Sequence, residues 1–161
     1  MNRKLAYLGL YTAAAMILSY IESLLPVFAG IPGIKLGLPN LVIVLVLYQY
    51  SFKEAALISA ARILAVGFLF GNMFSIVYSL AGAALSLFCM TLIKKVKGFS
   101  IAGVSMTGGV THNIGQLLVA MAVVENFSLV YYLPALLVSG VVTGFCIGIL
   151  ANEVRKRINI E

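Results

Sequence analysis

The residues best suited to binding a small molecule are a few polar side chains that stand within long apolar stretches. Arg62 interrupts one stretch, and His112, Asn113 and Gln116 interrupt another. His112 and Gln116 are four residues apart, so they share one face of a helix. Together with Arg62 they can hydrogen-bond a polar or anionic group. Further candidates for the same binding site are Glu22, Lys35, Asn40, Asn72 and Tyr78.

Two roles are open for Arg62. An arginine at the centre of a membrane helix costs about 2.5 to 3.5 kcal/mol, so its side chain should face the protein interior and have a partner. The partner could be an anionic group of the ligand. Alternatively, Arg62 could pair with Glu22 or with backbone carbonyls and hold the helices together. Glu22 is the only carboxylate expected near it, at the outer end of the first predicted span.

The composition indicates which kind of protein positions these side chains. Of the 161 residues, 62% are hydrophobic and only 10% are charged, whereas about a quarter of the residues of a soluble domain are charged. So little polar surface excludes a soluble enzyme and a nucleic-acid-binding protein. A bilayer-spanning helix needs roughly 20 apolar residues. The uncharged runs 5–21, 36–52, 63–93, 98–124 and 126–152 therefore predict a multi-pass protein of the cell membrane, in contact with lipid.

The basic residues predict how many helices span the membrane. They cluster near residues 3–4, 94–97 and 155–157, and such clusters accumulate on the cytoplasmic side. An even number of spans must then separate successive clusters. We expect an all-α integral membrane protein, a single domain of six transmembrane helices with both termini cytoplasmic. The predicted spans are about 5–25, 36–51, 54–70, 72–93, 101–123 and 128–151.

The connection between the first two spans is unusual. Residues 26–39 contain three of the four prolines, which forbid a continuous helix, yet the segment is apolar. It could be an outward-facing lid over a ligand site or a purely structural re-entrant turn.

Other patterns concern packing and absent chemistry. Gly140, Gly144 and Gly148 form a small-residue stripe, which lets helices approach closely within the chain or against a partner. The sequence contains no phosphate-binding G-x-x-x-x-G-K-[ST] motif and no aspartate. We therefore expect no enzyme activity, no cofactor and no metal site.

Several stretches resemble the Gx transporter family, also called heptaprenyl diphosphate synthase component I. They are Leu18-Ser-Tyr-Ile-Glu-Ser23, Ile31-Pro-Gly-Ile-Lys-Leu-Gly37 with Asn40, Arg62 followed by Gly71, Tyr78-Ser-Leu-Ala-Gly82, His112-Asn-Ile-Gly-Gln116 and Tyr131-Tyr-Leu-Pro134. The resemblance covers essentially the whole chain. This family is similar to the substrate-binding (S) components of energy-coupling factor (ECF) vitamin transporters, which are six-helix proteins with a ligand site capped by the first loop.

The resemblance implies two alternative functions. An S component would capture a small, partly apolar or aromatic molecule, and partner subunits would supply ATP hydrolysis. Gly9 and Ala13 would then form the face that docks on the membrane coupling subunit. Alternatively, the protein would be a non-catalytic membrane subunit that anchors or regulates a prenyl diphosphate synthase. Prenyl, quinone-precursor and flavin-like ligands all fit a cavity with one arginine and one histidine.

Overall fold

The fold consists of helices throughout the part of the chain that the structure describes. This computed structural model describes residues 3–25 and 35–158. The helices are α1 (Arg3–Leu24), α2 (Leu38–Gln49), α3 (Phe52–Phe70), α4 (Met73–Lys94), α5 (Ile101–Val124), the 3-10 helix η1 (Phe127–Tyr132) and α6 (Leu133–Arg157). The all-α prediction is confirmed. The predicted lid falls largely on residues 26–34, which lie outside the described residues.

Local capping explains where the helices begin. Ser51 and Ser100 cap α3 and α5, because each side chain accepts a hydrogen bond from a backbone N–H of the first turn. Asn72 and Ser75 form a reciprocal capping box at α4. Before α2, Gly37 adopts a left-handed conformation with φ of 75°. Glycine takes this conformation without steric cost, and α2 therefore begins two residues later than predicted.

The start of α6 differs from the sequence prediction. A helical span was expected from residue 128, but residues 127–132 form η1 and the α-helix begins only at Leu133. Asn126 initiates η1 by accepting a hydrogen bond from the Ser128 N–H. Pro134 then occupies the first turn of α6, where its missing N–H has no cost. The helix continues to Arg157, six residues beyond the predicted end at 151.

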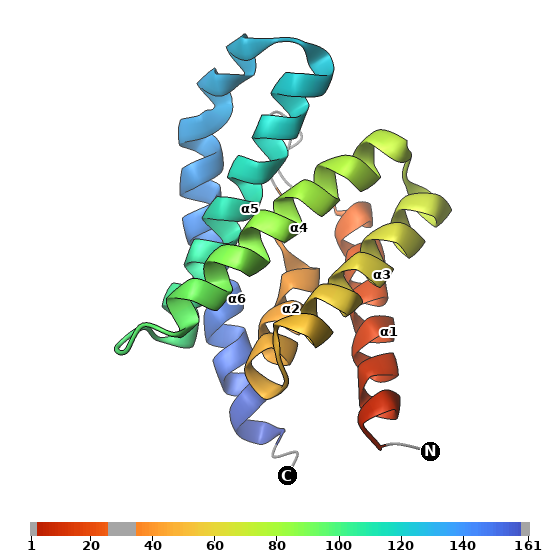
Figure 1. Cartoon of the computed structure of the whole chain (residues 1–161), viewed down its shortest axis with the longest axis vertical. Helices are drawn as coiled ribbons and strands as arrows, with labels where there is room; N and C mark the ends of the chain where they lie inside the picture. Colours follow the sequence, from red (N-terminus) through yellow and green to blue (C-terminus); the bar gives the residue numbers. More distant parts are fainter. Residues whose placement is uncertain (1–2, 26–34, 159–161) are drawn as a thin grey trace.

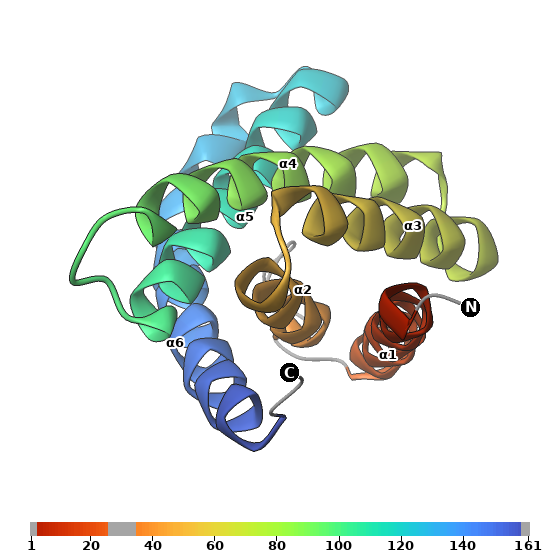
Figure 2. The same ribbon diagram turned by 60° about the horizontal axis from the view of Figure 1, so that its bottom comes forward.

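Helix α2 is the centre of the bundle. In Figure 2 it lies among the other helices, and it contacts α1, α3 and α6. Its residues from Val42 to Leu47 are all buried, each with at most 5% exposure. A helix that is apolar on every side is covered on every side. The middle of α2 is therefore covered by protein on every side.

Helices α5 and α6 pack closely through glycines. A Cβ added at Gly144 would lie 2.7 Å from the Cα of Met106, and one at Gly140 would lie 2.9 Å from the backbone of Gly109. Gly148 faces Ala102 in the same way, with 2.5 Å to its Cα. The glycine stripe of α6 is thus used within the chain, against α5.

The three basic clusters gather at one end of the molecule, where α1 begins and α6 ends (Figure 1). Lys94 of α4 and Arg155 of α6 lie over the ring of Tyr48, 4.9 and 5.3 Å from its centroid. Lys4 of α1 lies 5.8 Å from the centroid of Tyr50. Each contact has the geometry of a cation–π interaction. We call this region, at the C-terminal end of α2, the basic end.

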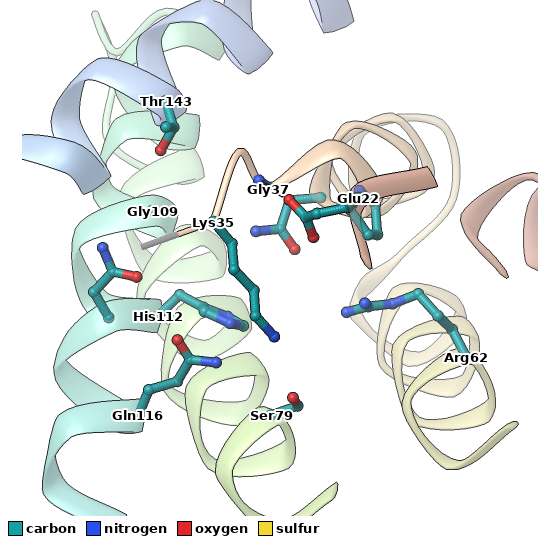
Figure 3. Close-up of a pocket in the computed structure, with 12 residues that line it drawn as sticks. Glu22, Lys35, Gly37, Arg62, Ser79, Gly109, His112, Gln116 and Thr143 are labelled. Atoms are coloured by element: carbon teal, nitrogen blue, oxygen red, sulfur yellow. Dashed lines mark hydrogen bonds between the residues drawn. The ribbon is translucent and has the colours of Figure 1, made fainter. Parts of the chain in front are cut away.

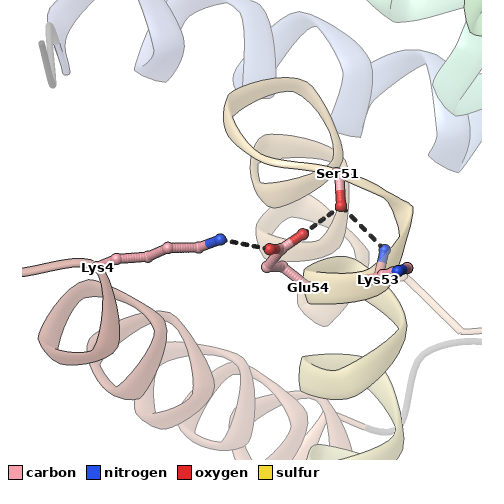
Figure 4. Close-up of polar contacts among 4 residues, drawn as sticks. All are labelled: Lys4, Ser51, Lys53 and Glu54. Atoms are coloured by element: carbon pink, nitrogen blue, oxygen red, sulfur yellow. Dashed lines mark hydrogen bonds and ion pairs between the residues drawn. The ribbon is translucent and has the colours of Figure 1, made fainter. Parts of the chain in front are cut away.

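An ion pair joins α1 to α3 at the basic end. The Lys4 ammonium lies 2.5 Å from a carboxylate oxygen of Glu54. Glu54 also accepts a hydrogen bond from the Ser51 hydroxyl, which itself accepts from the Lys53 N–H (Figure 4). This pair is partly exposed, and such pairs contribute at most about 1 kcal/mol. It fixes the start of α1 against the cap of α3.

Within residues 3–25 and 35–158, four helical segments are long and apolar enough to cross a membrane: α1, α4, α5 and the continuous stretch of η1 and α6. Helix α2 is apolar but has only 12 residues, which is about 18 Å of helix. Helix α3 has 19 residues and carries Lys53, Glu54 and Arg62.

Candidate functional site

A polar pocket lies where the six α-helices meet, with a cavity volume of about 50 Å³. Its lining residues are Glu22 (α1), Lys35 and Gly37 (before α2), Pro39 and Asn40 (α2), Arg62 (α3), Ser79 (α4), Gly109, His112, Asn113 and Gln116 (α5), and Thr143 (α6). Figure 3 shows the side chains of Lys35, Arg62 and His112 pointing toward one another. All the binding residues predicted from the sequence except Asn72 and Tyr78 line this pocket.

Arg62 has a partner that the sequence did not predict. Its Nη1 donates to the hydroxyl of Ser19 on α1 over 3.2 Å. Among the described residues, Glu22 makes no ion pair with Arg62, and the guanidinium Nε is buried without a hydrogen-bond partner. Of the two roles left open for Arg62, the pairing with Glu22 does not occur in this structure, and the guanidinium Nε is free to serve a ligand.

Glu22 instead holds the start of α2. One carboxylate oxygen accepts from the N–H of Gly37 over 2.5 Å and from the N–H of Leu38 over 3.3 Å. The first N–H groups of a helix have no partner within the helix and favour negative charge. Glu22 thus satisfies the N-terminus of α2 beside the pocket.

His112 and Gln116 approach α4 closely because Gly82 lies opposite them. A Cβ at Gly82 would lie 2.9 Å from the His112 carbonyl oxygen and 2.7 Å from Cγ of Gln116. His112 Nδ1 and Gln116 Nε2 are buried, and neither has a hydrogen-bond partner in the part of the chain that the structure describes. Such buried groups are normally paired in proteins. Both nitrogens are available to a bound group.

Asn113 lines the pocket and also connects two helices of the bundle. Its side-chain amide donates to the carbonyl of Leu136 over 2.7 Å and to the hydroxyl of Ser139 over 3.3 Å, both on α6. Its amide hydrogens therefore tie α5 to α6, and only its oxygen remains for a ligand.

Asn72 and Tyr78 lie away from the polar pocket. Asn72 is exposed and caps α4. Tyr78 stacks on Phe74, with ring centroids 5.6 Å apart, and lines a different cavity. The sequence placed them with the other polar residues because it could not show which face of α4 turns toward α5.

Two larger cavities adjoin the polar pocket. One, of about 370 Å³, lies between α1, α3 and α4 and shares Glu22, Lys35, Arg62 and Ser79 with the pocket. The other, of about 400 Å³, shares only Lys35 with it. The second cavity is lined mainly by apolar side chains of α4, α5, η1 and α6: Phe74, Tyr78, Leu117, Ala120, Val124, Leu129, Tyr132 and Leu136, with Ser75 and Lys35. We call it the side cavity.

The predicted docking residues lie on the open face of α1. Gly9 and Ala13 are both exposed, and a Cβ at Gly9 would meet nothing within 4 Å. Leu5 and Ile17 continue the same face, with 66% and 59% exposure. This face of α1 is covered by no other described part of the chain.

The described residues that line the pocket include one histidine, His112, and one carboxylate, Glu22. Over residues 3–25 and 35–158, no three His, Cys, Asp or Glu side chains come together as a metal site would require. The pocket holds a single carboxylate, Glu22, and that carboxylate already accepts two hydrogen bonds from α2. Its other polar groups include donors, such as those of Lys35 and Arg62, and acceptors, such as the side-chain oxygen of Asn113.

The long apolar helices and the enclosed polar site define a helical multi-pass membrane protein. The chain belongs to the heptaprenyl diphosphate synthase component I family, whose model matches residues 11–154. The chain matches no curated protein and no solved structure.

Proposed function

We propose that this protein is the substrate-binding component of an ECF-type uptake transporter for a small, partly apolar or aromatic molecule. It is not an enzyme, and partner subunits hydrolyse ATP. Six helices cross the cell membrane as a single domain, with the basic end and both termini in the cytoplasm. The polar pocket then lies toward the opposite end of α2.

The observation that carries this proposal is the convergence of unpaired nitrogens on one pocket. Arg62 Nε, His112 Nδ1 and Gln116 Nε2 are buried without partners among the described residues, and all three residues line the same cavity. Each buried unsatisfied group costs about 1 to 3 kcal/mol. A ligand that forms hydrogen bonds with these groups removes this cost, so the arrangement favours a bound state.

The proposed orientation of the protein in the membrane, with the basic end in the cytoplasm, rests on the positive-inside rule. The basic clusters of α1, α4 and α6 meet around Tyr48 and Tyr50, which supports their lying on one side of the membrane. Lys35, Gly37 and Asn40 line the pocket at the other end of α2, where the loop after α1 could close over a ligand.

The partners proposed here are a membrane coupling subunit and ATPase subunits. The exposed small-residue face of α1, with Gly9 and Ala13, supports a helix-to-helix contact with another membrane protein. No phosphate-binding loop occurs in the sequence, so the energy must come from other chains.

The first test is mass spectrometry of the proteins that co-purify with the tagged chain from its native membranes. We expect a membrane coupling subunit and ATPases. The double variant Gly9→Leu with Ala13→Leu places large side chains on this face of α1. The coupling subunit and the ATPases should then no longer co-purify. The matched control is Val138→Leu, since Val138 is equally apolar, 65% exposed and on α6. Normal recovery of ATPases with the double variant would contradict the docking face.

A second candidate follows from the description of the family, which names a component of heptaprenyl diphosphate synthase. In this case the protein is a non-catalytic membrane subunit that anchors or regulates the synthase. Lys95 and Lys97 are exposed at the basic end and would meet a soluble partner. Recovery of a soluble prenyl synthase without any ATPase, lost on Lys95→Gln with Lys97→Gln, would establish this function instead.

A further inference from the structure

The polar pocket is too small to hold a whole substrate. Its volume is about 50 Å³, whereas pockets for small organic molecules usually measure about 300 to 1,000 Å³. A bound molecule must therefore place one group in the polar pocket and the rest in an adjoining cavity.

The polar pocket selects for negative charge. Arg62 and Lys35 bring two positive charges, and the one carboxylate, Glu22, already accepts two backbone hydrogen bonds from α2. Arg62 Nε and Gln116 Nε2 are buried donors without a described partner. Hydrogen bonds from a guanidinium to carboxylate or phosphate oxygens are stronger than neutral ones. An anionic group with several acceptor oxygens is the best match.

The side cavity selects for an apolar group. Its volume is about 400 Å³, and its walls are formed largely by Phe74, Tyr78, Leu117 and Leu136. Phe74 is 41% exposed and Tyr132 is 39% exposed, so the rim of the cavity reaches the molecular surface. Apolar groups gain about 0.8 kcal/mol for each methylene that leaves water.

Lys35 joins the two spaces. It lines the polar pocket and the side cavity, and it also lines the competing cavity between α1, α3 and α4. Figure 3 shows its ammonium reaching between His112 and Arg62. A ligand whose charged group lies beside this residue would therefore have the side cavity within reach of its apolar part.

We propose that the substrate is an anionic amphiphile, with its charged group in the polar pocket and its apolar part in the side cavity. This inference rests on the proposed function and names the substrate class of the same site. The cavity between α1, α3 and α4 is the competing location for the apolar part. It is less suitable because the polar residues Ser19, Glu22, Ser23 and Arg62 contribute to its wall and are absent from the side cavity.

The test uses the full chain in nanodiscs of neutral phospholipid, with empty nanodiscs subtracted. The probes are octyl phosphate, butyl phosphate, octanol and inorganic phosphate, followed by equilibrium dialysis. We expect octyl phosphate to bind at least tenfold more tightly than octanol or inorganic phosphate. Between butyl and octyl phosphate, affinity should rise by up to about fourfold per methylene. Equal binding of octanol, or of inorganic phosphate, would overturn the proposal.

Two matched variants locate the apolar part. Ala120→Phe narrows the side cavity, and Val66→Phe narrows the competing cavity. We expect Ala120→Phe to weaken octyl phosphate at least tenfold and to leave inorganic phosphate unchanged, whereas Val66→Phe should have little effect. The reverse result would overturn the assignment of the side cavity. The chain-length series on the unmodified protein provides a test that does not depend on how the variants fold.

Adding phosphatidylglycerol to the nanodiscs distinguishes a soluble amphiphile from a membrane lipid as the ligand. If the substrate is a soluble amphiphile, the anionic lipid should not displace octyl phosphate. Displacement would support the same chemistry with a lipid headgroup as its source, and it would count against small-molecule uptake. If octyl phosphate does not bind in either type of nanodisc but the ATPases still co-purify with the chain, only the proposed substrate class is overturned. The transporter proposal then stands.

Discussion

Arg62 of α3 donates a hydrogen bond to Ser19 of α1 over 3.2 Å. The nearby carboxylate of Glu22, less than one turn further along α1, accepts hydrogen bonds from the start of α2 instead. The two charged groups are thus held by different elements. A positive charge is left facing the pocket with donors to spare, which is what an anion-binding site requires.

Arg62→Met should leave the empty protein as stable as the original or stabilise it by about 1 to 3 kcal/mol. The substitution removes a buried Nε that has no described partner, and methionine fills similar space. Thermal unfolding in detergent measures the effect. Ser19→Ala is the matched control and should be destabilising, since it removes the described partner of the guanidinium. A large loss of stability in Arg62→Met would mean that the charge holds the bundle together.

Glu22→Ala should destabilise the protein by about 1.5 to 3 kcal/mol, because it removes a charged acceptor from the N-terminus of α2. Glu22→Gln keeps an acceptor oxygen and should cost less. Hydrogen exchange at the amides of Gly37 and Leu38 provides a local readout, with faster exchange expected in Glu22→Ala. Unchanged exchange at both amides would show that the carboxylate does not protect them in solution.

Gly144→Ala and Gly9→Ala should have opposite effects. At Gly144 the added methyl group would lie 2.7 Å from the backbone of α5 and force the helices apart, at a cost of about 1 to 3 kcal/mol. At Gly9 the methyl group meets nothing within 4 Å, and alanine is the better helix former by about 0.5 to 1 kcal/mol. Unfolding temperatures measured side by side test this. Equal tolerance at the two positions would contradict the packing of α6 on α5.

Lys94→Met should be destabilising, and Lys95→Met should be nearly neutral. The Lys94 ammonium donates to the carbonyl of Leu47 over 2.6 Å, at the end of α2, and also lies over the ring of Tyr48. Losing a hydrogen bond from a charged donor costs about 1.5 to 3 kcal/mol. Lys95 is exposed. If both variants unfold at the same temperature, the contact of Lys94 with α2 contributes nothing.

Much of the fold is predictable because apolar runs and capping residues are local signals. The positions of all six α-helices follow from the uncharged runs and the turns between them, usually within a few residues. The last span was expected from residue 128, and the corresponding helical stretch begins at Phe127. Its opening 3-10 turn was not predicted, because an apolar run does not distinguish a 3-10 turn from an α-helix. The family was also identified from the sequence and is confirmed.

The sequence predicts most of the residues that line the candidate site, but not the hydrogen bonds that these residues make. Polar residues in apolar helices must turn inward, so Arg62, His112 and Gln116 could be expected to meet. The contact of Arg62 with Ser19 joins residues 43 positions apart, and no local pattern encodes it. The side cavity is also invisible in the sequence, since Leu117 and Ala120 look like any other apolar residues of a helix.

The burial of α2 has a mechanical consequence. This helix is a strut about 18 Å long, clamped at its first turn by the Glu22 carboxylate beside the pocket and at its last by the Lys94 ammonium. If a bound ligand shifts the first turn of α2, the last turn would shift with it, because an α-helix changes little in length. On the proposed function, α2 would then couple the pocket to the basic end, where Lys94 of α4 holds its last turn.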